Sequence, residues 1–325
     1  MTTATLHGNA AERRATWLEL FFDLVFAAAV AEVSGVLGSN YTVSGLTQFG
    51  FLFLMIWSAW VGHTLFSSRF DTDDLVQRLL TLAQMFAVAV MAVNADGPLG
   101  SRTSAGFAAA YGAMRLVLAG QYLRAGILQE PRDLAGHFAL LVGAGAVLWL
   151  GGSLLPPGSG ILVWGLALTL DLATPWLLHD RTGRRPHHPT HLPERFGLFT
   201  LILLGESLAA MMAGMKQHEY WSAPAAAVAV SGILIAFGIW WTYFHLIRAA
   251  DVRQVRSARD ARQEQRWIWG HLPLCFGIAL TAVGVEHVLS HGAHGLSGET
   301  GFVLAAGGVI LVAALATIRR ERTER

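Results

Sequence analysis

Ten long apolar segments divide this chain, and they constrain its fold more than any other feature of the sequence. Most of them are close to the roughly twenty residues that an α-helix needs to cross the hydrocarbon core of a bilayer. We therefore predict an all-α, polytopic membrane protein with about ten transmembrane helices. The predicted spans cover residues 17–37, 45–66, 76–95, 104–124, 135–155, 160–178, 196–215, 223–247, 267–289 and 300–318.

The basic residues fall almost entirely into alternate gaps between these segments. Of the 23 lysine and arginine residues, only Arg102 and Lys216 lie in the other set of gaps, and only Arg115 lies inside a span. Because loops rich in lysine and arginine stay on the cytoplasmic side of a membrane, both termini are predicted to be cytoplasmic. The predicted parts are a cytoplasmic N-terminus (1–16), a single transmembrane helical domain (17–318) and a cytoplasmic tail (319–325), in a multi-pass protein of the inner (plasma) membrane.

The composition agrees with a membrane protein and excludes other classes. Hydrophobic residues make up 54% of the chain and charged residues 14%, which leaves too little polar surface for a soluble protein of this length. The arginine-rich stretch 248–266 interleaves acidic residues with its arginines, as is typical of a loop beside anionic lipid headgroups. The lipid bilayer is therefore the expected partner and nucleic acid is not. The single cysteine, Cys275, excludes disulfide chemistry, and no cofactor is expected.

Spans one to four and seven to ten resemble each other, which predicts an internal repeat. The best match sets Gly106-Phe107 and Arg124 at the same offset as Gly301-Phe302 and Arg319. Because the matched spans are six apart, an even number, the two copies would share one orientation in the membrane. A chance alignment of helices rich in alanine, glycine and valine remains the alternative.

Charged residues inside the spans are the main candidates for a functional site. A charge at the bilayer centre costs about 2.5–3.5 kcal/mol on insertion scales and is kept only where it faces protein or water. Counted at about 1.5 Å per residue from the inner ends, Asp23, Asp171, Arg115 and Glu206 lie about 9–14 Å deep. They are expected to meet in one layer in the inner half of the bundle.

Three further residues extend this predicted layer toward both faces of the membrane. Glu19 and His271 lie nearer to the inner face, and Glu286 lies toward the outer end of span nine. In one interpretation Arg115 neutralises carboxylates, foremost Glu206, and the cluster only fixes helix packing. In the other, carboxylates at graded depth form a pathway for protons or a cation from Glu19 and Asp23 through Glu206 to Glu286. Both interpretations stay open at this point.

The sequence Asp71-Thr72-Asp73-Asp74 suggests an enzymatic alternative. The pattern DxDD resembles the general-acid motif of class II terpene cyclases, in which a protonated aspartate starts a carbocation cascade. Aromatic residues near the inner ends of spans two and eight could stabilise such cations. A surface cluster that caps the helix of span three is the simpler explanation, because a helix N-terminus favours negative charge.

Loop histidines and one ion pair complete the set of candidates. Two histidine trios (187, 188 and 191; 287, 291 and 294) have spacings compatible with zinc, but neither cysteine nor HExxH accompanies them, so no metal site is predicted. Glu194 and Arg195 enter span seven together. Arg195 could reach back to Glu19 and form a cytoplasmic gate.

Four segments together resemble the bacterial low temperature requirement A family. They are TWLELFFDLVF (16–26), RFDTDD (69–74), HLPERFGLFTLILLGES (191–207) and HLPLCFGIALTAVGVE (271–286), in this order. The resemblance implies an integral membrane protein of many helices, and it brings neither a substrate nor assigned catalytic residues. Its motifs coincide with candidates singled out above on physical grounds: Glu19, Asp23, Asp73, Asp74, Glu194, Arg195, Glu206, His271 and Glu286.

These observations favour a protein that moves a small solute or ion with proton coupling. Carboxylates at graded depth can titrate, whereas a sodium ion would need a denser cage of oxygen ligands. The alternatives are an intramembrane enzyme for a lipid or isoprenoid substrate, with Asp71, Asp73 and Asp74 as the catalytic aspartates, and a membrane scaffold without catalytic activity. Association into a homo-oligomer is also compatible with the sequence.

Overall fold

A computed structural model shows an all-helical chain. It describes residues 13–70, 72–97, 101–129, 132–182, 185–216, 223–247, 258–291 and 298–323. The helices are α1 (Trp17–Ser39), α2 (Val43–Arg69), α3 (Leu75–Val93), α4 (Arg102–Leu128), α5 (Arg132–Ser153), α6 (Pro157–Leu177), the short α7 (His179–Thr182), α8 (His191–Met215), α9 (Ala223–Trp241), the π-helical turn η1 (Thr242–Ile247), α10 (Ala258–His291) and α11 (Gly298–Thr323).

Side chains at the helix starts explain where several of these elements begin. The Thr16 hydroxyl accepts a hydrogen bond from the Glu19 backbone while the Glu19 side chain accepts from the Thr16 backbone, so a capping box opens α1. Thr42, Asp74 and Ser101 cap α2, α3 and α4 in the same manner with one side-chain bond each. Polar residues in the gaps thus end one span and start the next within a few residues.

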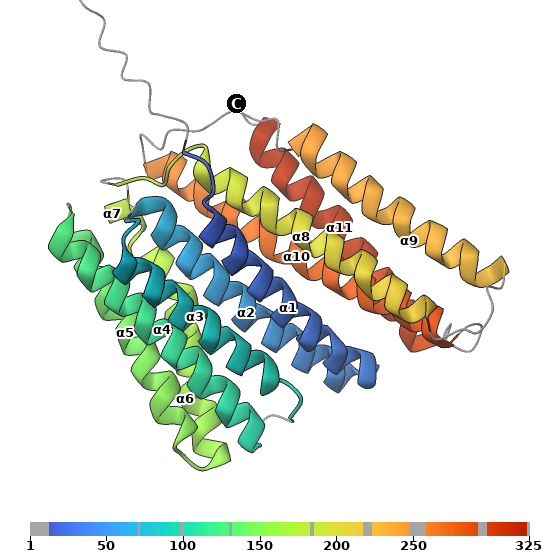
Figure 1. Ribbon diagram of the computed structural model, residues 1–325, viewed down its shortest axis with the longest axis horizontal. Helices are drawn as coiled ribbons and strands as arrows, with labels where there is room; N and C mark the ends of the chain where they lie inside the picture. The colour runs from blue at the N-terminus through green and yellow to red at the C-terminus, as the bar shows by residue number, and fades with distance from the viewer. Residues whose placement is uncertain are drawn as a thin grey trace, which may run out of the picture.

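The long helices lie side by side in one bundle, with α1 and α2 in its middle. Figure 1 shows α3 to α6 on one side of this pair and α8 to α11 on the other, with α9 outermost. Helix α1 packs against α2, α3, α8 and α10. In α2, 78% of the most apolar window is buried, against 17% in α9. The core of the protein therefore surrounds α1 and α2.

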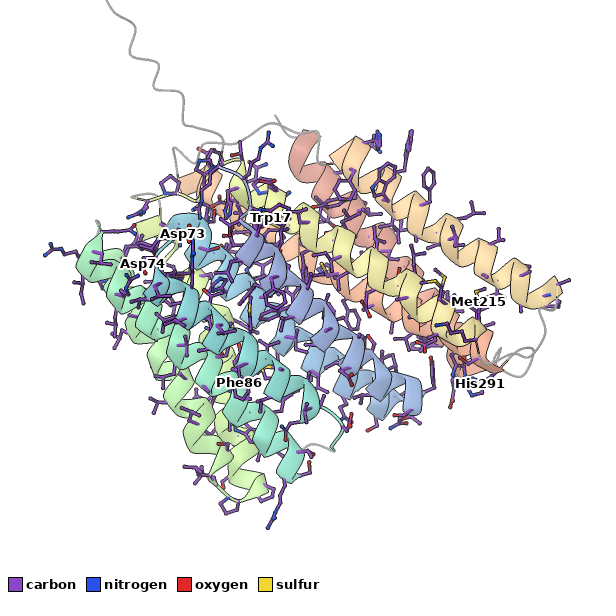
Figure 2. The ribbon with its side chains drawn as sticks, viewed as in Figure 1. Trp17, Asp73, Asp74, Phe86, Met215 and His291 are labelled. Atoms are coloured by element: carbon purple, nitrogen blue, oxygen red, sulfur yellow. The ribbon has the colours of Figure 1, made fainter. Side chains whose placement is uncertain are left out.

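The predicted class of fold is confirmed. Nine helices of the described chain are long and apolar enough to cross a membrane, and α4 is equally long but less apolar. It carries Arg115 and Gln121, which face its neighbours instead of lipid, and it lies between α3 and α5. Apolar side chains cover the outside of the bundle, such as Phe86 at 71% exposure (Figure 2), so these surfaces contact the bilayer. The parallel repeat stays a prediction.

Several helices extend beyond the spans predicted from hydropathy. Helix α8 begins at His191 instead of 196, α10 covers Ala258–His291 instead of 267–289, and α11 continues to Thr323. The segment 223–247 is divided into α9 and the turn η1. Hydropathy marks where the apolar stretch ends, whereas a helix continues through charged residues as long as its backbone bonds are made.

The segments that connect the helices lie alternately at the two ends of the bundle. Trp17, Asp73 and Asp74 lie at one end, and Met215 and His291 lie at the other (Figure 2). The arginine-rich gaps in the described chain therefore share one end, as the alternation in the sequence requires. That this end faces the cytoplasm stays a prediction.

Candidate functional site: two buried ion pairs

The first ion pair joins Asp23 on α1 to Arg195 on α8. Arg195 donates from Nη2 to Asp23 Oδ1 at 2.5 Å and from Nε to Oδ2 at 3.2 Å, and both side chains are completely buried. The Trp60 indole on α2 donates a third hydrogen bond to Asp23 Oδ1 at 2.7 Å. The consecutive helices α1 and α2 and the distant helix α8 therefore meet at one carboxylate.

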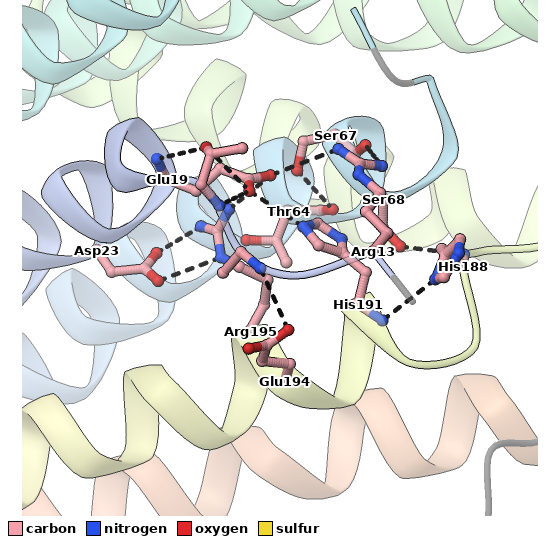
Figure 3. Close-up of polar contacts among 12 residues, drawn as sticks. Arg13, Glu19, Asp23, Thr64, Ser67, Ser68, His188, His191, Glu194 and Arg195 are labelled. Atoms are coloured by element: carbon pink, nitrogen blue, oxygen red, sulfur yellow. Dashed lines mark hydrogen bonds and ion pairs between the residues drawn. The ribbon is translucent and has the colours of Figure 1, made fainter. Parts of the chain in front are cut away.

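Glu19 lies one helical turn before Asp23 and forms a second layer of the same site. Its Oε1 is 3.1 Å from Arg195 Nη1, and its Oε2 is 3.1 Å from Nε2 of the fully buried His191. The same Oε2 accepts hydrogen bonds from the Thr16 backbone and hydroxyl. Arg195 thus lies between two carboxylates of one helix face (Figure 3).

The start of α8 fixes this arginine in place. The Glu194 side chain accepts a hydrogen bond from the Ala15 backbone at 3.2 Å, so the chain before α1 is joined to α8. The predicted approach of Arg195 to Glu19 is present, together with a closer bond to Asp23 that the sequence did not indicate. A role of Glu194 and Arg195 as a gate stays a prediction.

The second ion pair joins Arg115 on α4 to Asp171 on α6. Arg115 Nη2 donates to Asp171 Oδ1 at 2.6 Å, while Asp171 Oδ2 accepts from the Tyr111 hydroxyl at 3.1 Å and from the Trp149 indole at 2.9 Å. Arg115 is 4% exposed and Asp171 6%. A neutral pair of this kind avoids the cost of an isolated charge in the membrane.

Two glycines make room for the second pair. A methyl group at Gly62 would lie 2.9 Å from Arg115 Nη1, and one at Gly145 would lie 2.7 Å from Asp171 Oδ1. Both distances are shorter than van der Waals contact, so any larger residue would push the side chains of the pair away. Helices α2 and α5 therefore approach the ion pair through glycine.

Buried polar residues continue from the first pair toward α4. The His63 ring on α2 stacks on Phe22, the neighbour of Asp23, with ring centres 4.1 Å apart. Gln84 on α3 and Gln121 on α4 lie next to His63. All three side chains are at most 2% exposed, and none of the amide atoms of the two glutamines has a good hydrogen-bond partner in the described chain. The interior is therefore polar and incompletely paired at this level.

The four charges predicted to meet in one layer are not together: Arg115 pairs with Asp171, Asp23 pairs instead with Arg195, and Glu206 belongs to neither pair. The expected partnership of Arg115 with Glu206 is wrong, because Arg115 is bonded to Asp171. Glu206 is half-buried on α8, whose main neighbours are α1, α2, α9 and α10. The distance from a span end gives the depth of a residue, but it does not say which neighbouring helix its side chain faces.

His271 and Glu286 also lie apart from both pairs. His271 is fully buried and its Nε2 is 2.9 Å from the Tyr243 hydroxyl of η1, so it does not join the carboxylates as expected. Glu286 is only partly buried and lies near Tyr41, which follows α1 at the opposite end of the bundle from Glu19. The pathway from Glu19 to Glu286 through Glu206 stays a prediction.

Asp73 and Asp74 are exposed at the surface of the bundle. Arg78 donates to both oxygens of Asp73 at 2.9 and 3.0 Å and lowers the pKa of that carboxyl. The Asp74 carboxylate caps α3 by accepting from the Gln77 backbone and also pairs with Arg124, and its pKa is lowered. Both groups are thus held as anions, whereas an acid catalyst must be protonated. Asp71 lies outside the described residues.

The histidine trios are not arranged for a metal ion in the described part of the chain. His187 is 3.0 Å from Glu264 and beside Arg69, and burial together with this arginine lowers its pKa. His287 and His291 stack on each other, while His294 lies outside the described residues. No group of three histidine, cysteine, aspartate or glutamate side chains with metal-binding geometry occurs among the described residues.

The sequence did not single out most of the uncharged partners of the two pairs. Trp60, Tyr111, Trp149 and His63 are neutral and lie in apolar spans, where aromatic residues are usually packing elements. Only their closeness in the sequence to glycines or charged residues could have distinguished these side chains from aromatic residues that merely pack in the core. Both ion pairs therefore depend on aromatic hydrogen-bond donors, which a hydropathy pattern does not distinguish from other core residues.

Comparison with known proteins agrees with the motifs noted in the sequence. Residues 14–325 match the family model of the bacterial low temperature requirement A protein (LtrA). An uncharacterized protein of Rhizobium meliloti (strain 1021) is 29% identical over 298 residues, which are 87% of this chain and 71% of that protein. Two of the motifs contribute to the first ion pair: 16–26 supplies Glu19 and Asp23, and 191–207 supplies His191 and Arg195.

Proposed function

The chain belongs to the bacterial low temperature requirement A family, and from this premise we propose that it moves a small solute or ion across the membrane with proton coupling. The observation that carries the proposal is the fully buried Asp23–Arg195 pair between α1 and α8. Ionisable residues inside membrane spans are costly, and they commonly mark ion and substrate pathways.

The coupling step would be a change of partner for Arg195. One guanidinium serves Asp23 and Glu19, which are about 6 Å apart along α1, so protonation of Asp23 would remove its charge and leave Glu19 as the better partner. This shift would loosen the bond between α1 and α8. His191 and Glu19 lie between Asp23 and the arginine-rich end of the bundle, and they offer a route for that proton.

The proposed pathway continues beyond this site through Glu206 and Glu286. Glu206 lies in the middle of α8 next to Gly205 and Ser207, and neither described contacts nor an ion pair fix its carboxylate. Asp171 and Arg115 would form a second charged site of the pathway, on the other side of α2. The orientation with both termini in the cytoplasm and any homo-oligomeric assembly belong to the proposal as well.

The test is proton movement in proteoliposomes that contain a pH-sensitive dye. We expect the wild-type protein to carry flux driven by a pH gradient, and Asp23→Asn and Glu206→Gln to abolish it, because both amides are nearly isosteric but cannot carry a proton. Asp96→Asn, at an exposed loop position, is the matched control. Unchanged flux in both variants, or no flux in the wild type with any gradient and solute panel, would contradict the proposal and leave the ion pairs as packing elements.

A further inference from the structure

A cavity of about 50 Å³ lies beside the second ion pair. Residues from α2, α4, α5, α6 and α10 line it, so it sits where the α4–α6 group meets the middle of the bundle. Most of the wall is apolar. The lining residues with polar side-chain atoms are Trp57, Ser58, Arg115, Tyr122, Asp171, Thr174 and Trp269.

The polar atoms left unpaired on this wall are hydrogen-bond donors. Arg115 bonds Asp171 only through Nη2, and its buried Nε has no partner in the described chain. The indole nitrogens of Trp57 and Trp269 and the Ser58 hydroxyl are also buried without a hydrogen-bond partner among the described residues. Burying a donor without a partner is costly, so four such groups around one cavity call for an acceptor inside it.

The wall offers fewer acceptors than donors in return, chiefly the hydroxyl oxygens of Ser58 and Tyr122. Asp171 already accepts three hydrogen bonds, one on Oδ1 from Arg115 and two on Oδ2 from Tyr111 and Trp149. The Thr174 hydroxyl donates to the Leu170 carbonyl of its own helix. A water molecule in the cavity would need acceptors for its own two hydrogens, and the wall has few of them. A group that only accepts hydrogen bonds does not need such acceptors.

The size of the cavity restricts the occupant further. One water molecule needs about 10–15 Å³ of such volume, so the cavity has room for about four non-hydrogen atoms. We propose that it binds a small oxyanion of the carboxylate class, such as formate, acetate or bicarbonate, held by Arg115, Ser58 and Trp269. Asp171 partly neutralises the positive charge of Arg115 and thereby weakens its attraction for an anion. We therefore expect dissociation constants in the millimolar range.

Binding at this site stands apart from the proposed transport. Only the further step, that the bound oxyanion is the cargo, rests on the proposed function. The ion pair of Asp23 and Arg195 would then supply the coupling, and the cavity beside Arg115 would supply recognition. The two roles can be separated by experiment because they use different residues.

Equilibrium binding to the purified full-length protein tests the site. Formate and acetate are expected to raise the melting temperature saturably, while chloride and urea at the same concentration are not. The double variant Ser58→Ala/Trp269→Phe removes two donors with little change of volume, and we expect it to weaken oxyanion binding at least tenfold. Trp164→Phe is the matched control, because Trp164 also has a buried, unpaired indole nitrogen but does not line the cavity.

The outcomes separate the alternatives. No saturable shift with any of the oxyanions, or an equal shift in the double variant and the wild type, would overturn the proposed site and leave water as the occupant. Flux of labelled formate in proteoliposomes tests the cargo separately. If binding is seen and flux is not, the site stands and the transport function fails. If Asp23→Asn stops flux but keeps binding, the division of roles is supported.

Discussion

The two buried ion pairs have the same chemistry but differ in how completely they are closed. Arg195 contacts carboxylates through Nε, Nη1 and Nη2, and both it and Asp23 have no exposed side-chain surface. Arg115 makes its hydrogen bond to Asp171 through Nη2 alone and lines a cavity, and two glycines leave room for the side chains of this pair. Arg195 Nη1 makes no hydrogen bond in the described chain, but it lies 3.1 Å from Glu19 Oε1 as an ion pair, whereas Arg115 Nε has no such neighbour among the described ion pairs. Because a buried charge is costly without its partners, the closed pair is the more fully compensated of the two, and the open pair has capacity left for another molecule.

The largest expected effect comes from removing the arginine of the closed pair. Arg195→Met leaves Asp23 and Glu19 without their cation, which should destabilise the protein by about 3–5 kcal/mol. Arg115→Met should cost less, because Tyr111 and Trp149 still hold Asp171 and the cavity admits water to it. Unfolding of both variants in detergent measures the difference. Equal losses would contradict the distinction between a closed and an open pair.

The aromatic donors give a smaller effect in the same direction. Trp60→Phe removes an indole bond to a fully buried carboxylate and should cost about 1.5–3 kcal/mol. Trp149→Phe removes the corresponding bond to Asp171, but Asp171 lines the cavity, which can admit a water molecule as a replacement donor. We expect its loss of stability to be about half as large. The comparison is sharpened by measuring both free energies of unfolding with one denaturant, and a larger loss for Trp149→Phe would reverse it.

The class of fold could be predicted from the sequence because it depends on patterns that one chain displays locally. Apolar runs of helical length and the sorting of arginines are visible without any knowledge of packing. The extra turns of α8 and α10 could not be predicted, because Arg195 and Glu264 are stabilised by partners far away in the sequence. A prediction from hydropathy ends a span at such charged residues, although the helix continues through them.

The candidate residues were easier to predict than their partners. Asp23, Glu19, Arg195, Arg115 and Asp171 are conspicuous as charges in or next to apolar helices, and their approximate depth follows from counting residues. Which helix faces which is a property of the whole bundle, so the pairing of Arg115 with Asp171 was missed. The uncharged donors and the glycines at 62 and 145 carry no signal of their own.

A methyl group added at Gly145 tests how much room the open pair requires. Gly145→Ala places a carbon 2.7 Å from Asp171 Oδ1, and we expect a net loss of about 1 kcal/mol, since overpacking outweighs the gain in helix propensity. Gly143→Ala on the same helix meets only the Ala119 methyl at 3.6 Å, so it should be neutral or stabilising. Thermal unfolding of the two variants compares them directly. If Gly145→Ala is as stable as Gly143→Ala, the ion pair does not depend on this close approach.

The smallest effect is expected at the exposed pair of Asp73 and Arg78, which shows the same chemistry without burial. Hydrogen bonds from Arg78 lower the pKa of the Asp73 carboxyl, so the folded protein binds a proton there less readily than the unfolded chain. The pair therefore adds stability above the unfolded pKa of about 3.9, and this contribution is lost as the pH falls below that value. Asp73→Asn should lower the melting temperature only slightly at pH 7, because solvent and salt screen an exposed pair. The difference from the wild type should vanish in acid. A large loss at neutral pH would mean that ion pairing itself, and not burial, sets the difference between the sites. A loss that persists below about pH 3 would show that the effect of the substitution does not come from the ion pair.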